Sequence, residues 1–118
     1  LESVGDIKLN GKLLFSATAP TIAYGFGTSP NINTINGTAS FIVYVGNGGI
    51  ASSGTLNMPT ATTGWNCSTN ILSSQTGMLT NQISYTATTV TIRNYTVATN
   101  ADAPWTSGSS VNMLCTAF

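Results

Sequence analysis

The sequence predicts an all-β protein, an antiparallel β-sandwich, and three observations support this. The 118 residues contain several short runs of β-branched and aromatic residues, which favour strands. Clusters of Gly, Pro, Asn and Ser separate these runs at short intervals, as they do in sandwiches and barrels. No segment has the apolar spacing of an amphipathic helix. We expect one jelly-roll-like or Greek-key sandwich domain over residues 16–118, with 1–15 as a connector hairpin at its base.

The first 36 residues divide into two parts. Residues 1–15 have the pattern of a hairpin, because Asn10-Gly11 lies between two short apolar runs and is a strong turn signal. All but two of the charged residues lie in this part, which favours an exposed base or a connector to an upstream module. Residues 16–36 are interrupted by Gly and Pro, so we expect mostly loop. A short strand is expected between positions 22 and 26, where apolar residues alternate.

The clearest strand covers residues 38–45. Its odd-numbered side chains from Phe41 to Val45 point to one face, and Ile42 and Tyr44 point to the other. Both sets are apolar, whereas a strand on a solvated surface would alternate with polar residues. We therefore expect this strand to lie inside a sandwich or against another subunit.

A tight reversal is predicted directly after this strand. Residues 46–49, Gly-Asn-Gly-Gly, tolerate positive φ, so 54–58 is expected to be the return strand of a hairpin. Pro59 ends that strand because it lacks a backbone donor. The same signals predict further strands over 65–72, 82–87, 89–97 and 111–118, with loops over 73–80 and 100–110.

Two of these later strands carry more specific expectations. In the strand over 89–97, Val90 and Ile92 share one face, with Asn94 as a further member of it. The last strand reaches Phe118, so we expect this residue to be packed in place, since a free terminus would normally fray.

The charge content limits the partners of the chain. Charged residues make up 5% of the sequence, where a typical soluble domain has about 25%, and the net charge is +0. Without a basic patch there is no electrostatic source of binding to nucleic acid or to an anionic membrane. No apolar run approaches the roughly 20 residues of a spanning helix, so membrane insertion is not expected. Ser, Thr, Asn and Gly supply the polarity, as in extracellular β-structures and viral fibres.

The residues needed for catalysis are scarce. The chain has no histidine, the commonest general base and a frequent metal ligand. Its three carboxylates are Glu2, Asp6 and Asp102, which lie far apart in sequence, and two cysteines are too few for a zinc site. We therefore expect no enzyme activity, no metal and no cofactor.

The two cysteines permit two interpretations. Cys67 and Cys115 are either buried thiols on neighbouring strands or the partners of a single disulfide. The thiol interpretation is favoured for a protein assembled in a reducing cytosol.

Non-catalytic binding is the remaining class of function. Exposed aromatic side chains stack on sugar rings or anchor protein contacts. Trp105 lies in a predicted loop near Asp102 and is expected to be exposed, because loops often carry function. The expected receptor contacts are Trp105, Asp102, Asn47 and Tyr95.

Most of the chain, residues 25–118, resembles a module at the carboxyl end of tailed-phage fibre and appendage proteins. The segments that carry the resemblance are FGTSPNI, NGTASFIVYVGNGG, ASSGTLNMPTATTGWNC, TVTIRNYTV and WTSGSSVNMLCTAF. The resemblance implies a trimeric β-structured tip or knob on the virion that takes part in attachment to the host surface. It transfers no particular receptor-binding residue.

Two hypotheses follow from the resemblance and the composition. The first is a host-recognition domain with a cell-surface glycan or protein as its partner, working as a homotrimer beside other virion proteins. The second is a purely structural virion component, such as a head fibre, capsid decoration or trimerisation module. Exposed aromatics on the loops 46–53, 73–82 and 100–110 would favour the first. Their burial at a subunit interface would favour the second.

Overall fold

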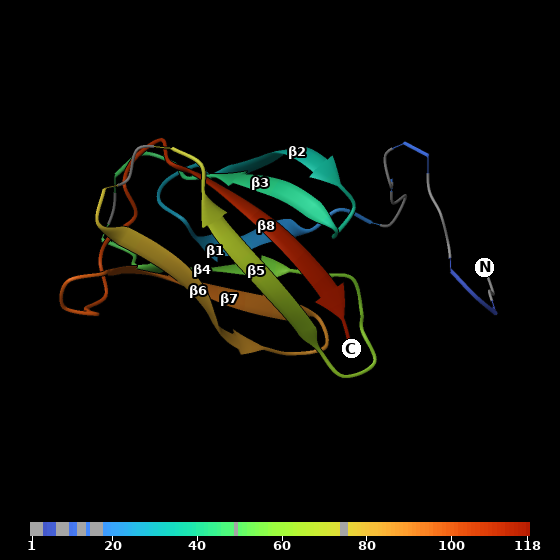
Figure 1. Ribbon diagram of the computed structural model, residues 1–118. Helices are drawn as coiled ribbons and strands as arrows, with labels where there is room; N and C mark the ends of the chain where they lie inside the picture. Colours follow the sequence, from blue (N-terminus) through green and yellow to red (C-terminus); the bar gives the residue numbers. More distant parts are fainter. Residues whose placement is uncertain (1–3, 7–9, 12–13, 15–17, 49, 74–75) are drawn as a thin grey trace.

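The structure is a computed structural model that describes residues 4–6, 10–11, 14, 18–48, 50–73 and 76–118. These residues form eight strands and no helix (Figure 1). The strands are β1 (Thr21–Gly25), β2 (Asn31–Asn36), β3 (Ser40–Tyr44), β4 (Ser53–Asn57), β5 (Trp65–Ile71), β6 (Met78–Tyr85), β7 (Thr89–Thr96) and β8 (Ser110–Ala117).

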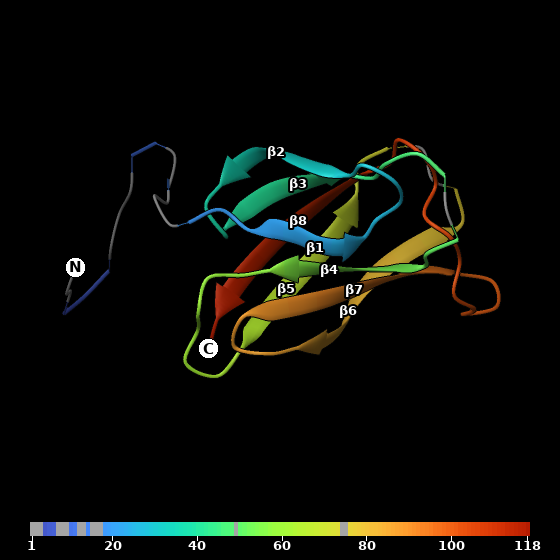
Figure 2. The same ribbon diagram turned by 180° about the vertical axis from the view of Figure 1, so that it is seen from behind.

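The strands form two antiparallel four-stranded sheets that face each other (Figures 1 and 2). One sheet has the order β1-β4-β7-β6 and the other the order β2-β3-β8-β5. The prediction of an all-β protein with the sheets of an antiparallel sandwich is confirmed. Only β2–β3 and β6–β7 pair as consecutive strands among the described residues, so the other connections cross between the sheets.

The core fills the space between the two sheets. In β3 and in β7, buried side chains alternate with half-buried ones, as the period of a strand requires. The predicted inner face of β7 is confirmed, because Val90, Ile92 and Asn94 are all fully buried. Ile42 and Tyr44, on the outer face of β3, are only half-buried, so the single chain covers one face of this strand.

The segment after β3 corrects the predicted hairpin. The chain does not return beside β3, because β4 lies in the other sheet, between β1 and β7. The strand that lies beside β3, on the side away from β2, is β8. It pairs Val111 with Val43 and Met113 with Phe41. All four of these side chains are buried, so the apolar run of β3 is matched by a distant strand rather than by its neighbour in sequence.

Two expectations for the first part of the chain have different outcomes. Strand β1 is present, but a bulge between Ile22 and Tyr24 breaks the alternation and leaves Tyr24 exposed. Strand β2 falls in a segment that was expected to be loop. The hairpin expected over 1–15 falls largely outside the described residues and stays a prediction.

The cysteines form a disulfide, so the thiol interpretation is wrong. Cys67 of β5 and Cys115 of β8 lie directly opposite each other in the register of these neighbouring strands, and both are buried. The expectation that they lie on neighbouring strands is confirmed. The choice of thiols depended on an assumed reducing compartment, whereas the strand register places the two side chains together.

One edge of the sandwich is closed by side chains. β5 and β6 are edge strands of different sheets, and Gln82 of β6 joins them. Its side-chain oxygen accepts the backbone N–H of Cys67 at 2.7 Å, and its amide nitrogen donates to the carbonyl of Trp65 at 2.8 Å. Gln82 therefore occupies the place of a hydrogen-bonded neighbour along this part of β5.

Replacing Gln82 by alanine is expected to lower the free energy of unfolding by about 2 kcal/mol, because it leaves a part-buried N–H and a carbonyl without partners. Urea denaturation of the two proteins measures the difference. Asn81→Ala is the matched control, since this exposed amide makes only a local contact, with the carbonyl of Gln82. Equal stability losses in the two variants would contradict the bridging role of Gln82.

Candidate binding surface at the loop end

Three long loops gather at one end of the sandwich. They follow β3, β5 and β7, and they lie on the left in Figure 1, opposite the end that holds the carboxyl terminus. Backbone hydrogen bonds join the loops to one another. The contacts are Val45 N–H to Ser109 at 2.8 Å, Val97 N–H to Gly77 at 2.9 Å and Trp105 N–H to Ala51 at 3.1 Å. We call this region the loop end.

Asn94 anchors the loop end from the core side. Its side chain is fully buried, and its amide nitrogen donates to the carbonyls of Ala103 at 3.0 Å and Pro104 at 3.1 Å. Its backbone N–H donates to the carbonyl of Ser52 at 2.7 Å. One residue of β7 therefore fixes both the loop before β4 and the loop before β8.

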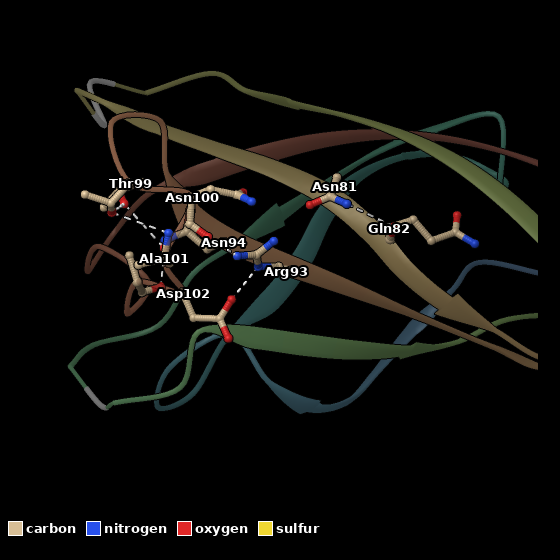
Figure 3. A network of polar contacts seen from close by, with 10 residues as sticks. Asn81, Gln82, Arg93, Asn94, Thr99, Asn100, Ala101 and Asp102 are labelled. Carbon is tan, nitrogen blue, oxygen red and sulfur yellow. Dashed lines mark hydrogen bonds and ion pairs between the residues drawn. The ribbon is translucent and has the colours of Figure 1, made fainter.

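Arg93 fixes the same loop from the outer face of the sheet. It forms an ion pair with Asp102, and it donates to the carbonyl of Asn100 at 2.5 Å (Figure 3). Its guanidinium carbon lies 4.7 Å from the centre of the Tyr95 ring, a cation–π contact. Two of the four expected receptor contacts, Asp102 and Tyr95, are thus brought together by a residue that was not among them.

Trp105 corrects the expectation of an exposed aromatic side chain. The residue is only 4% exposed, and its ring packs on the ring of Phe26 with the centres 5.1 Å apart. The loop folds back so that the indole completes the core at this end of the sandwich. The indole N–H has no hydrogen-bond partner within the described part of the chain. In this structure Trp105 supports the loop from behind and does not present a contact surface.

Asn47 belongs to a second group at the loop end. The residue is exposed, and its side-chain oxygen accepts a hydrogen bond from the Ser107 hydroxyl at 3.0 Å. Its backbone exchanges two hydrogen bonds with Thr28, of 2.9 Å and 3.2 Å. Asn47 is therefore held in a defined position and leaves its amide nitrogen available.

An aromatic groove at the opposite end was not foreseen. Tyr85 and Phe118 are each 51% exposed there and contact each other edge to face. The two residues lie 33 positions apart, and neither is in one of the loops expected to carry function. Two features of the sequence pointed toward this pair: Phe118 was expected to be packed in place, and Tyr85 lies near the end of the strand predicted over 82–87.

The described residues were compared with the requirements of a metal site and of a membrane-spanning helix. They contain no group of three or more His, Cys, Asp or Glu that could hold a metal ion. A helix long and apolar enough to cross a membrane is likewise not found in the described ranges. At the loop end the chemistry consists of one balanced ion pair, amides, hydroxyls and backbone groups.

Comparison of the chain with protein-family models, with curated proteins and with solved structures finds no match.

Proposed function

We propose that this chain is a tip domain of a tailed-phage fibre or appendage, which attaches the virion to the host cell surface by non-catalytic binding. The observation that carries the proposal is the loop end, where long loops are fixed to one another and to the core by Asn94, Arg93 and Trp105. Binding by pre-ordered loops avoids the entropy cost of ordering them on contact. The loops therefore form a surface suited to recognition.

The exposed groups of the loop end define what it would contact. Asn47 offers an amide and Asp102, with a side chain 63% exposed, offers a carboxylate already balanced by Arg93. Groups of this kind form directional hydrogen bonds with the hydroxyls of a glycan or with the polar groups of a surface protein. Single contacts of this sort are weak, so attachment would depend on several copies acting together.

A homotrimeric knob is part of the proposal, together with its jelly-roll-like or Greek-key character. Support comes from apolar side chains on the outer face of the β2-β3-β8-β5 sheet. Leu114 is 51% exposed there, and Ile42 and Tyr44 are half-buried on the same face. Apolar surface of this kind is commonly covered by a partner, and in a closed ring each copy covers the same patch on its neighbour.

The test is binding of the fluorescently labelled domain to intact cells of a panel of bacterial hosts, with its solution mass measured by sedimentation. We expect a trimer of three 12.2 kDa chains that labels at least one host. The double variant Asn47→Ala/Asp102→Ala should reduce labelling at least about tenfold, because each loss is repeated in every copy.

The matched control is Thr60→Ala, an exposed residue in the loop that precedes β5, at the other end of the sandwich. It should label cells as the unchanged domain does. A monodisperse monomer at micromolar concentration would contradict the trimer. If Thr60→Ala lost as much labelling as the double variant, this result would contradict the assignment of cell binding to the loop end.

A structural virion component is the second candidate, because the burial of Trp105 in the core removes an exposed loop aromatic that would have favoured attachment. Trp105 is the only aromatic residue in the loops after β3, β5 and β7, so the described part of these loops exposes no aromatic ring. A trimer that labels no host in the panel would support this candidate over attachment.

A further inference from the structure

A groove lies at the end of the sandwich opposite the loop end, where β5 begins and β6 ends. Its volume is about 440 Å³, and it is lined by Trp65, Asn66, Gln82, Tyr85, Thr116 and Phe118. A second hollow of about 500 Å³ shares Asn66, Gln82 and Tyr85 with it and extends along β6 to Ile83. The two hollows adjoin each other at these three residues and are together called the groove; each is within the size range of small-ligand sites.

The floor of the groove is aromatic. The rings of Tyr85 and Phe118 lie edge to face with their centres 5.2 Å apart, and each residue is about half exposed. Trp65 lies largely buried beside them, and its indole N–H donates to the carbonyl of Pro59 at 2.8 Å. Two aromatic rings with open surface therefore line the hollow together with a third ring that is already hydrogen-bonded within the protein.

This aromatic pair is held in place by the backbone around Gly64. The N–H of Phe118 donates to the carbonyl of Gly64 at 2.9 Å, and the carbonyl of Phe118 accepts from Thr63 at 2.8 Å and from Gly64 at 3.0 Å. A Cβ on Gly64 would lie 2.3 Å from the ring of Tyr85 and 3.1 Å from that of Phe118. The rings thus pack directly onto a residue without a side chain, which pre-orders the site.

The rim of the groove carries two uncharged polar side chains that are exposed to solvent. Asn66 of β5 and Thr116 of β8 lie directly opposite each other, and both are exposed. Gln82, in contrast, already uses both ends of its amide on β5. None of the side chains that line the described groove is charged, so these side chains offer amide and hydroxyl groups beside an apolar ring surface.

We infer that this groove binds a neutral hexopyranose unit of a glycan. A pyranose ring presents an apolar C–H face and a rim of hydroxyls, and the groove presents the matching surfaces: the Tyr85 and Phe118 rings for the face, Asn66 and Thr116 for the hydroxyls. A charged sugar would find no charged side chain among those that line the groove. The inference rests on the groove alone and does not depend on the proposed role of the loop end.

The experiment is a titration of the ¹⁵N-labelled domain with the methyl glycosides of glucose, galactose, mannose and N-acetylglucosamine, followed by the amide signals. We expect at least one glycoside to give saturable shifts at Asn66, Tyr85 and Thr116, with a dissociation constant on the order of millimolar for a single ring. Tyr85→Ala should raise that dissociation constant about tenfold, because the stacking surface is lost.

Two controls separate the groove from exposed residues elsewhere. Tyr24→Ala removes an aromatic residue that is 66% exposed on β1, and it should leave the dissociation constant unchanged. Asn66→Ala tests the rim without disturbing the ring packing, and its control is Asn70→Ala, an exposed amide on the same face of β5. We expect Asn66→Ala to weaken binding several-fold and Asn70→Ala to have no effect.

Three outcomes would overturn the inference. They are the absence of saturable shifts at the groove with every glycoside, equal weakening by Tyr85→Ala and Tyr24→Ala, and groove signals that change on dilution of the protein without sugar. The last result would show that a second copy of the chain occupies the groove. Because Asn66 is exposed, its variant decides the question even if Tyr85→Ala fails to fold.

Discussion

Replacing Asn94 by aspartate is expected to lower the free energy of unfolding by about 3–5 kcal/mol at pH 7, although the two side chains have nearly the same shape. Asn94 is fully buried and donates to the carbonyls of Ala103 and Pro104. A carboxylate has no N–H to donate, and it would place a buried negative charge against two carbonyl oxygens. Urea denaturation at several pH values measures the loss.

The pH dependence of this variant gives an independent check. Burial beside two carbonyl oxygens raises the folded-state pKa of the new carboxyl above its unfolded value of about 3.9. A raised folded-state pKa means that the protonated form is the one the fold accepts, so the variant recovers stability as the pH falls toward 4 and loses it as the pH rises.

The control for this prediction is Asn70→Asp, which introduces the same charge at an exposed position of β5. It should change the free energy of unfolding by no more than about 0.5 kcal/mol. Asn94→Asp with a similarly small effect would show that the amide of Asn94 does not hold the loop that leads to β8.

Removing the disulfide by the double substitution Cys67→Ala/Cys115→Ala is expected to cost about 4 kcal/mol of unfolding free energy. The bridge closes a segment of 48 residues, and the entropy it removes from the unfolded chain grows slowly with that length. Alanine is chosen because both positions are buried, where serine would add an unpaired hydroxyl.

A reducing agent tests the same bridge without mutation. Dithiothreitol should lower the urea midpoint of the unchanged domain close to that of the double variant, and it should leave the double variant unaffected. An unchanged midpoint for the native sequence under full reduction, with thiol content measured to show that reduction occurred, would contradict a stabilising role for the bridge.

The strands with the strongest alternation were predictable from sequence because their faces differ in chemistry. Val90 and Ile92 identify the inner face of β7, and Phe41 and Val43 that of β3. Strand β2 was not predicted, because its residues Asn31–Asn36 are three Asn, one Thr and only two isoleucines, a composition that resembles a loop. Its strand character comes from pairing with β3, which local propensity does not report.

The pairing of strands could not be predicted for a related reason. The Gly-rich turn after β3 is compatible with a hairpin, which is excluded because β2 and β8 lie on the two sides of β3 and β4 belongs to the other sheet. Residues far apart in sequence decide this contact. The disulfide is a further case. The register of β5 and β8 sets Cys67 opposite Cys115, whereas the spacing of the two cysteines along the chain does not indicate that they pair.

The candidate contacts show the same limit. Asn47 and Asp102, which carry short polar side chains, are exposed, and their role as contacts stays a prediction. Loop position was expected to expose Trp105 as well. That expectation failed, because a large apolar ring gains more free energy from covering the end of the core than from contact with water. The rings of Tyr85 and Phe118 contact each other and also pack against Gly64, a three-way contact that no local pattern indicates.

The most direct test of attachment is competition on live cells. Intact bacteria of the panel are incubated with the labelled domain and increasing amounts of unlabelled domain. The proposal predicts saturable labelling of at least one host that the unlabelled domain displaces and that Asn47→Ala/Asp102→Ala displaces at least about tenfold less well. A folded trimer that labels no host, or labelling that an excess of unlabelled domain leaves unchanged, would contradict it.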